Sequence, residues 1–293
     1  MSTFRLAHIS DLHLAPPAPV LARRRMPLKA HLSRFAWRRK GAGHSMEALG
    51  ALIADLQTQN PDHVAITGDL TNFSTSEEFA AAGEWLRGWA DPQDVTVSPG
   101  NHDALAGGAG PERFQPWAPW LGDEGTVQFP SVRRRGAVAL INLSSATPTP
   151  LHLAQGHLGE QQLERLGGVL KKTGDEGLCR VVLLHHPPAP GTVSRRKSLK
   201  DGPALLSVLH EYGAELVLHG HAHQACVASL AGPNGSIPVL GVPSASAVGG
   251  HDAPARWHCI SIENTAKGWK LQVTARGLNG GGAMIELGRY SLV

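Results

Sequence analysis

The stretch Phe4-Arg-Leu-Ala-His-Ile-Ser-Asp-Leu-His-Leu14 joins an apolar, strand-like run to two polar side chains, Asp11 and His13. Four further segments of this kind follow along the chain. They are Gly68-Asp69, Gly100-Asn101-His102-Asp103, His185-His186-Pro187-Pro188 and Gly220-His221-Ala222-His223. Each lies at or just past the carboxyl end of a predicted strand, where open α/β sheets bind their ligands. We therefore expect side chains more than 200 positions apart to meet at one sheet edge.

The pattern between these segments predicts an α/β domain, because short β-branched runs alternate with helical ones. The predicted strands span residues 4–10, 63–67, 95–98, 137–143, 179–184 and 215–218. Apolar residues at helical spacing follow strands within residues 46–56, 79–86, 163–170 and 205–209. From Ala225 onward, short strands between Gly, Pro and Asn turns predict a second, more antiparallel sheet.

The length and composition are those of one globular domain covering residues 1–293. Hydrophobic residues make up 42% of the chain, yet no run approaches the roughly 18 unbroken apolar residues of a membrane span. The amino-terminal segment also lacks the features of a secretory signal, so we expect a cytoplasmic protein. The three cysteines are far apart in sequence, which disfavours both a disulfide framework and a thiolate zinc site.

The side chains of the five segments suit a metal site. Carboxylate, imidazole and amide groups together favour Mn²⁺, Fe or Zn²⁺ over Ca²⁺. In an extended strand, Asp11 and His13 would point to the same side and reach one ion, and the same holds for His221 and His223. Gly-Asp alone is a common turn dipeptide, and Asp-x-His alone is nearly as weak a signal. The joint occurrence of all five segments, in order and each after a strand, is what predicts the site.

All five segments resemble the motifs of the calcineurin-like metallophosphoesterases, over Ile9 to His223. The residues of the first and fourth segments are most similar to those of the class III cyclic-nucleotide phosphodiesterase branch. This resemblance implies a four-layer αββα sandwich that holds two divalent or trivalent metal ions, with manganese, iron and zinc as candidates. It also implies one metal held by Asp11, His13 and His223, a second held by Asn101, His185 and His221, and a bridging Asp69. His185 is preferred over His186 because the family's ligand is the first histidine of the pair.

The resemblance implies a catalytic role for His102, which would contact the phosphate and support or protonate the leaving oxygen. Asp103 is then expected to fix the orientation of its imidazole. Arg195 and Arg196, in the loop after His185, are expected to bind a distal phosphate or sugar. These four residues complete the predicted site.

The expected activity is hydrolysis of phosphodiester bonds, in a cyclic nucleotide or a small organic diester, by attack of a hydroxide that bridges two metals. The chain contains no phosphate-binding Gly-x-x-x-x-Gly-Lys-Ser/Thr loop and no serine elbow, which disfavours nucleoside triphosphatases and serine hydrolases. Two alternatives stay open: a nucleotide-sugar lipid pyrophosphate hydrolase at the membrane surface, and a non-catalytic scaffold. The substrate is expected to be a small phosphorylated molecule. Whether the protein forms a homo-oligomer is left open.

A basic segment at residues 15–44 follows the first motif. It carries eight Lys or Arg and no Asp or Glu, interleaved with apolar residues. Its alternatives are a lid over an anionic substrate, a contact with anionic lipid headgroups, and a solvated surface. His44 could reach substrate from such a lid. Because the positive charge is confined to local segments, nucleic acid is disfavoured as a partner.

Overall fold

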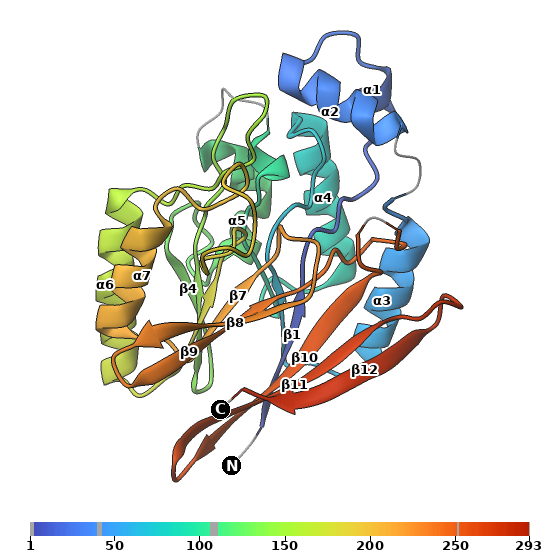
Figure 1. Cartoon of the computed structure of the whole chain (residues 1–293). Coiled ribbons are helices and arrows are strands. Elements are labelled where there is room, and N and C mark those ends of the chain that lie inside the picture. Colours follow the sequence, from blue (N-terminus) through green and yellow to red (C-terminus); the bar gives the residue numbers. More distant parts are fainter. Residues whose placement is uncertain (1–2, 40–42, 106–110, 251, 293) are drawn as a thin grey trace.

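The computed structural model describes residues 3–39, 43–105, 111–250 and 252–292, and these form two facing sheets with helices on both outer sides (Figure 1). The first sheet has the order β12-β11-β10-β1-β2-β3 and the second β4-β5-β6-β7-β9-β8. The predicted αββα sandwich is confirmed. Among the described residues, no helix is long and apolar enough to cross a bilayer.

The first sheet comprises β1 (Phe4–Ile9), β2 (His63–Ile66), β3 (Val95–Val97), β10 (Arg256–Thr265), β11 (Gly268–Leu278) and β12 (Met284–Ser291). The second comprises β4 (Ser131–Arg135), β5 (Val138–Asn142), β6 (Cys179–Leu183), β7 (Leu216–His219), β8 (Cys226–Gly232) and β9 (Gly235–Gly241). The helices are α1 (Ala18–Ala22), α2 (Leu28–Arg39), α3 (Met46–Thr58), α4 (Ser76–Trp89), α5 (Ala118–Leu121), α6 (Glu160–Asp175) and α7 (Gly202–Tyr212). Two 3₁₀ segments, His102–Ala104 and Pro111–Trp117, complete the set.

Three apolar cores hold the layers together. The first sheet packs against α3 and α4, the second against α6 and α7, and the sheets pack against each other through residues such as Leu6, Leu140 and Val181. Trp117 and Trp120, which the Pro-rich sequence around them places in a loop region, are buried in the first of these cores. Their role is therefore core packing.

Parallel strand pairing brings the predicted motifs to one edge. β1, β2 and β3 are mutually parallel in the first sheet, as are β5, β6 and β7 in the second. Asp11, Asp69 and Asn101 follow the three strands of the first sheet, while His185 and His221 follow β6 and β7. Since the carboxyl ends of parallel strands share an edge, the five segments converge there.

The predicted separate sheet beyond Ala225 is wrong. β8 and β9 extend the second sheet, whereas β10, β11 and β12 extend the first by antiparallel pairing that begins at β1. The change of sequence pattern therefore marks antiparallel additions at existing sheet edges. The edge strand β4 was missed because its sequence Ser-Val-Arg-Arg-Arg looks polar, although Arg133 and Arg135 are ion-paired with Asp123.

The basic segment forms α1 and α2, which lie above the edge where the motifs converge (Figure 1). Val20 and Ala30 pack with Phe73 and Leu105 of the sheet-edge loops. The amino group of Lys29 donates to Thr149 and to the Leu153 carbonyl, across the opening between the sheets. The segment is therefore anchored to both halves of the sandwich over its described residues, which exclude 40–42.

Buried neutral histidines make the fold sensitive to acid. Burial lowers the pKa of His258 from 6.5 to about 4, and it has the same effect on His219. Between pH 6.5 and pH 4 the unfolded state binds protons at these histidines that the folded state does not. Their contribution to the free energy of unfolding is therefore complete above pH 6.5 and is lost as the pH falls to 4. We expect His258 alone to account for about 3 kcal/mol of this loss.

Urea unfolding of a His258→Gln variant between pH 7 and pH 4 checks this expectation. The slope of the unfolding free energy against pH should decrease by up to about 1.4 kcal/mol per pH unit. His210→Gln, at an exposed position, is the matched control and should leave the slope unchanged. Equal slopes in both variants and the wild type would contradict the assignment.

Candidate metal centre

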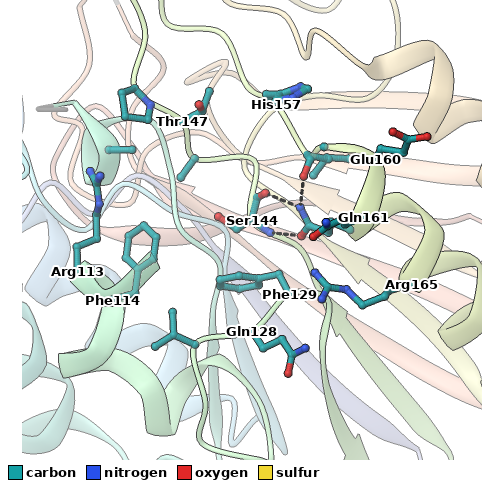
Figure 2. A pocket seen from close by; sticks show the side chains of 17 residues that line it. Arg113, Phe114, Gln128, Phe129, Ser144, Thr147, His157, Glu160, Gln161 and Arg165 are labelled. Carbon is teal, nitrogen blue, oxygen red and sulfur yellow. Dashed lines mark hydrogen bonds between the residues drawn. The ribbon is translucent and has the colours of Figure 1, made fainter. Parts of the chain in front are cut away.

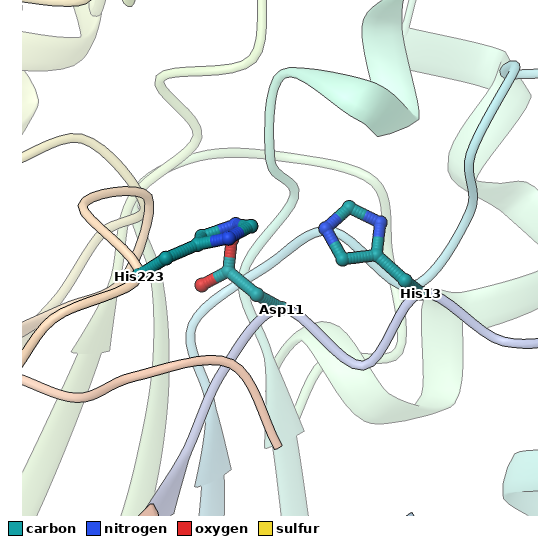
Figure 3. Close-up of side chains that lie close together, drawn as sticks. All are labelled: Asp11, His13 and His223. Atoms are coloured by element: carbon teal, nitrogen blue, oxygen red, sulfur yellow. The ribbon is translucent and has the colours of Figure 1, made fainter. Parts of the chain in front are cut away.

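The first candidate ligand group consists of Asp11, His13 and His223. One ligand atom from each lies within 4.8 Å of the others. Figure 3 shows the Asp11 carboxylate between the two imidazoles, which approach from the loops after β1 and β7. His223 Nε2 is 3.0 Å from Asp11 Oδ1. Residues from opposite ends of the chain thus converge on one point.

The second group consists of Asp11, Asp69 and His185. His185 Nε2 lies 3.3 Å from Asp69 Oδ2 and 3.1 Å from Asn101 Oδ1, while its Nδ1 donates to the Thr67 carbonyl at 2.7 Å. That last bond fixes the ring so that Nε2 points at the oxygen ligands. Asp11 belongs to both groups, which places them next to each other.

His221 lies beside these groups without belonging to either. Its backbone N–H donates to Asp11 Oδ2 at 3.0 Å, and its ring centroid is 5.0 Å from that of His185. His186 Nδ1 is 2.7 Å from the Ser145 hydroxyl, and its ring centroid is 4.4 Å from that of His221. The structure therefore gathers all seven predicted ligands and places His185, rather than His186, against Asp69 and Asn101.

The local backbone that aims these side chains is left-handed. Within the described part of the chain, seven non-glycine residues have positive φ. Five of them are predicted ligands: Asp11 at 53°, His13 at 44°, Asp69 at 56°, His221 at 66° and His223 at 53°. Such conformations cost free energy and cluster at functional sites. The expectation that strand alternation aligns Asp11 with His13 is therefore wrong, because both residues lie beyond β1 in tight turns.

The buried carboxylates of the cluster are stabilised in their charged form by positive charge nearby. Burial alone would raise the pKa of Asp11 and Asp69, but His223 and His185 respectively hold both pKa values well below the usual range. Burial alone would likewise lower the pKa of His223, yet Asp11 raises it to about 10. The buried His13 Nε2 has no hydrogen-bond partner. Two buried carboxylates, facing imidazoles and one open nitrogen fit metal cations in place of these protons.

Two further residues, Asp252 and His44, were not identified as possible ligands from the sequence, and with His223 they form a third group whose ligand atoms lie within 4.8 Å of one another. Asp252 Oδ2 lies 3.0 Å from His223 Nδ1, the carboxylate-histidine arrangement that orients a metal ligand. The ring centroid of His44, considered only as a substrate contact, is 4.4 Å from that of His13. Its Nδ1 is 2.9 Å from the Ser246 hydroxyl. Neither residue lies in a strand-end motif, so only the tertiary structure reveals them.

The expected orientation of His102 by Asp103 is wrong. His102 Nδ1 donates to the Asn72 carbonyl at 2.9 Å, while the Asp103 carboxylate accepts from the backbone N–H groups of Asp69, Thr71 and Gly100. Burial, followed by the nearby Asp69 carboxylate, raises the pKa of Asp103 to about 7. Asp103 therefore braces the turn that carries Asp69.

Comparison with known proteins decides the family. A family model described as calcineurin-like phosphoesterase matches residues 4–225. The chain belongs to the calcineurin-like phosphoesterase family. Members use a dinuclear metal centre, and the two ligand groups that share Asp11 agree with this. The resemblance inferred from the five motifs is confirmed.

Two curated relatives narrow the branch. A probable cyclic nucleotide phosphodiesterase from Synechococcus sp. is 28% identical over 230 residues, or 76% of this chain and 80% of that protein. The glycerophosphodiester phosphodiesterase GpdQ of Enterobacter lignolyticus is 27% identical over 169 residues, or 56% of this chain and 57% of that protein. Both names support the class III branch. This calcineurin-like chain is a hydrolase acting on phosphoric ester bonds.

A solved structure agrees on the fold. The dimetal phosphatase from Danio rerio superposes with a TM-score of 0.61 at 15% identity, covering 97% of this chain and 98% of that one. At this identity the likeness establishes the architecture alone. It supports the two-sheet sandwich described above.

A cavity of about 580 Å³ opens beside the His102 segment of this phosphoesterase (Figure 2). Its walls include the rings of Phe114 and Phe129, and Arg113 and Arg165 lie at its sides. Ala104, two residues past His102, is also part of the lining. The volume is in the range that small organic ligands occupy.

The loop that contains Arg195 and Arg196 approaches the metal centre through its backbone. The Lys197 carbonyl lies 3.0 Å from His221 Nε2. Both arginine side chains are exposed, and the Arg195 carbonyl accepts a hydrogen bond from Gln155. The loop backbone therefore contacts the ligand cluster, whereas no contact between either arginine side chain and a ligand is seen among the described residues.

Proposed function

We propose that this phosphoesterase hydrolyses a small phosphodiester at a dinuclear centre. The observation that carries the proposal is the pair of ligand groups that share Asp11, at a sheet edge next to an organic-sized cavity. The names of the two curated relatives, a probable cyclic nucleotide phosphodiesterase and a glycerophosphodiester phosphodiesterase, support a diester over a monoester.

In this proposal, Asp11, His13 and His223 would hold one metal, Asn101, His185 and His221 would hold the other, and Asp69 would be a ligand of both. The contact of Asp69 with His185 and the burial of both Asp11 and Asp69 support the set, although the two groups that contain these carboxylates have Asp11 rather than Asp69 in common. The mixed oxygen and nitrogen ligands favour manganese, iron or zinc.

When bound, the two cations would acidify a water and clamp the phosphoryl oxygens during in-line displacement. The chain's own contribution is to hold the leaving group. With Nδ1–H donating to the Asn72 carbonyl, the His102 ring is fixed, and in its imidazolium form it would deliver the Nε2 proton to the leaving oxygen and be left as the neutral imidazole. The organic part of the substrate occupies the cavity against Phe114 and Phe129, and Arg195 and Arg196 receive a distal phosphate or sugar.

Metal analysis combined with two assays tests the function. The purified protein, supplemented with Mn²⁺, should contain about two metal ions per chain. It should also cleave bis-p-nitrophenyl phosphate faster than p-nitrophenyl phosphate. A metal-free protein without activity under Mn²⁺ would overturn the proposal, and a strong preference for the monoester would overturn the diester specificity.

A His102→Gln variant tests the proton donor. We expect kcat to fall by about 10²-fold or more for a diester with an alkyl leaving group, because a poor leaving oxygen needs the proton. The loss should be smaller for p-nitrophenolate, which departs without protonation. His152→Gln, at an exposed position, is the matched control. Equal losses with both leaving groups would contradict the role of His102.

A further inference from the structure

We propose that the protein docks onto an anionic lipid surface through the outward face of α2 and the Arg24-Arg25 pair before it. The proposal is independent of the substrate at the metal centre. It concerns where the molecule works. The occupant we commit to is a bilayer that carries negatively charged headgroups.

The outward face of α2 is apolar where a surface helix is usually polar. Leu28 is 66% exposed, Leu32 is 42% exposed and Phe35 is 57% exposed. These residues are spaced i, i+4 and i+7, so they form one stripe along the helix. A contiguous apolar stripe of this kind at the surface marks an interaction site.

The opposite face of the same helix is the one that holds it to the protein. Ala30 is buried with Val20 and Phe73, and Trp37 meets the Phe73 ring at 6.2 Å between centroids. Arg34 donates to the backbone carbonyls of Val20 and Arg23. Since these contacts fix α2 through its inner face, Leu28 and Leu32 remain exposed on the outer face, where a partner can reach them.

The charge around the stripe is positive and selects the partner. Residues 15–44 carry eight Lys or Arg and no acid, whereas the whole chain carries only +3. Arg24 and Arg25 are exposed directly before the helix. A second copy of the chain would bring like charges together, and a nucleic acid offers nothing to the apolar stripe. An anionic bilayer fits both the positive charge and the apolar stripe. Its headgroups would attract the arginines, and the leucines would insert at the boundary with the acyl chains.

The position of α2 gives this docking a consequence for the site. The inner face of the helix packs on Phe73 and Leu105, which follow the Asp69 and Asn101 turns, and α2 lies above that edge in Figure 1. A bilayer against the outer face would therefore face the same edge as the metal centre. The protein would hydrolyse substrates close to the lipid surface.

Co-sedimentation with vesicles tests the docking. The full chain should bind vesicles of phosphatidylglycerol and phosphatidylcholine in equal parts, bind phosphatidylcholine alone much less, and release as salt rises to about 0.5 M. Each of Leu28→Glu and Leu32→Glu should reduce the partition coefficient by about tenfold or more. An Arg24→Glu/Arg25→Glu variant should reduce binding to the anionic vesicles only.

Val227→Glu is the matched control, since Val227 on β8 is 64% exposed and lies outside α2. It should bind vesicles like the wild type, and all variants should keep wild-type hydrolysis of bis-p-nitrophenyl phosphate. No binding to anionic vesicles, or equal binding by the α2 variants, overturns the proposal. So does a dimer in light scattering that Leu28→Glu dissociates, because the stripe would then be an interface between copies.

Discussion

An Asp69→Asn variant is expected to lose diester hydrolysis by about 10³-fold or more, because the proposed bridge between the two cations would lose its charge. Asp69 is buried, accepts from the His102 N–H at 2.7 Å and faces His185 Nε2 at 3.3 Å. Asparagine keeps the size of the side chain and one oxygen for the His102 N–H. The substitution therefore removes the negative charge while the turn keeps its shape.

The measurements are kcat/KM for bis-p-nitrophenyl phosphate and metal content per chain by mass spectrometry. Both should fall in Asp69→Asn, while the circular dichroism spectrum stays that of the wild type. Asp175→Asn is the matched control, because Asp175 is an exposed carboxylate on α6 that forms an ion pair with Lys171. If Asp69→Asn kept wild-type activity and metal content, Asp69 would not be a ligand of the metal centre.

The sequence predicted the gathering of the ligands because the signal lies in strand order. Asp11, Asp69 and His185 each follow a short apolar strand, and parallel pairing within each sheet, together with the packing of the two sheets against each other, brings them together. The layer architecture followed from the same alternation of strands and helices. These inferences depend on periodicity, which a single sequence displays directly.

Other features depend on contacts between segments that have no local signature. Asp252 reaches His223 from a Gly-rich loop, and the arginines of β4 are ion-paired with Asp123 and Glu176, which are distant or separate in sequence from the strand. The left-handed turns at Asp11 and His13 also escaped prediction, since only glycine announces positive φ in a sequence. Tertiary packing, rather than local preference, decides all three.

The second large effect is expected from a glycine rather than from a ligand. A Cβ on Gly100 would lie 2.2 Å from Asp69 Oδ1 and 2.6 Å from the Asp69 backbone nitrogen. Because both atoms belong to a buried turn, Gly100→Ala must displace the Asp69 carboxylate. We expect activity to fall by about 10²-fold or more, as misplacement of about 1 Å in a catalytic constellation can cost that much.

Gly88→Ala is the matched control, since a Cβ there meets nothing within 4 Å. Gly88 lies in the last turn of α4, so the same substitution should leave activity unchanged and raise the free energy of unfolding by less than about 1 kcal/mol. Raising the Mn²⁺ concentration distinguishes the cause in Gly100→Ala. If the displaced carboxylate only weakens metal binding, excess metal restores part of the activity. Wild-type metal affinity together with wild-type turnover would contradict the prediction. It would show that the turn tolerates a methyl group and that the close approach of Gly100 does not position Asp69.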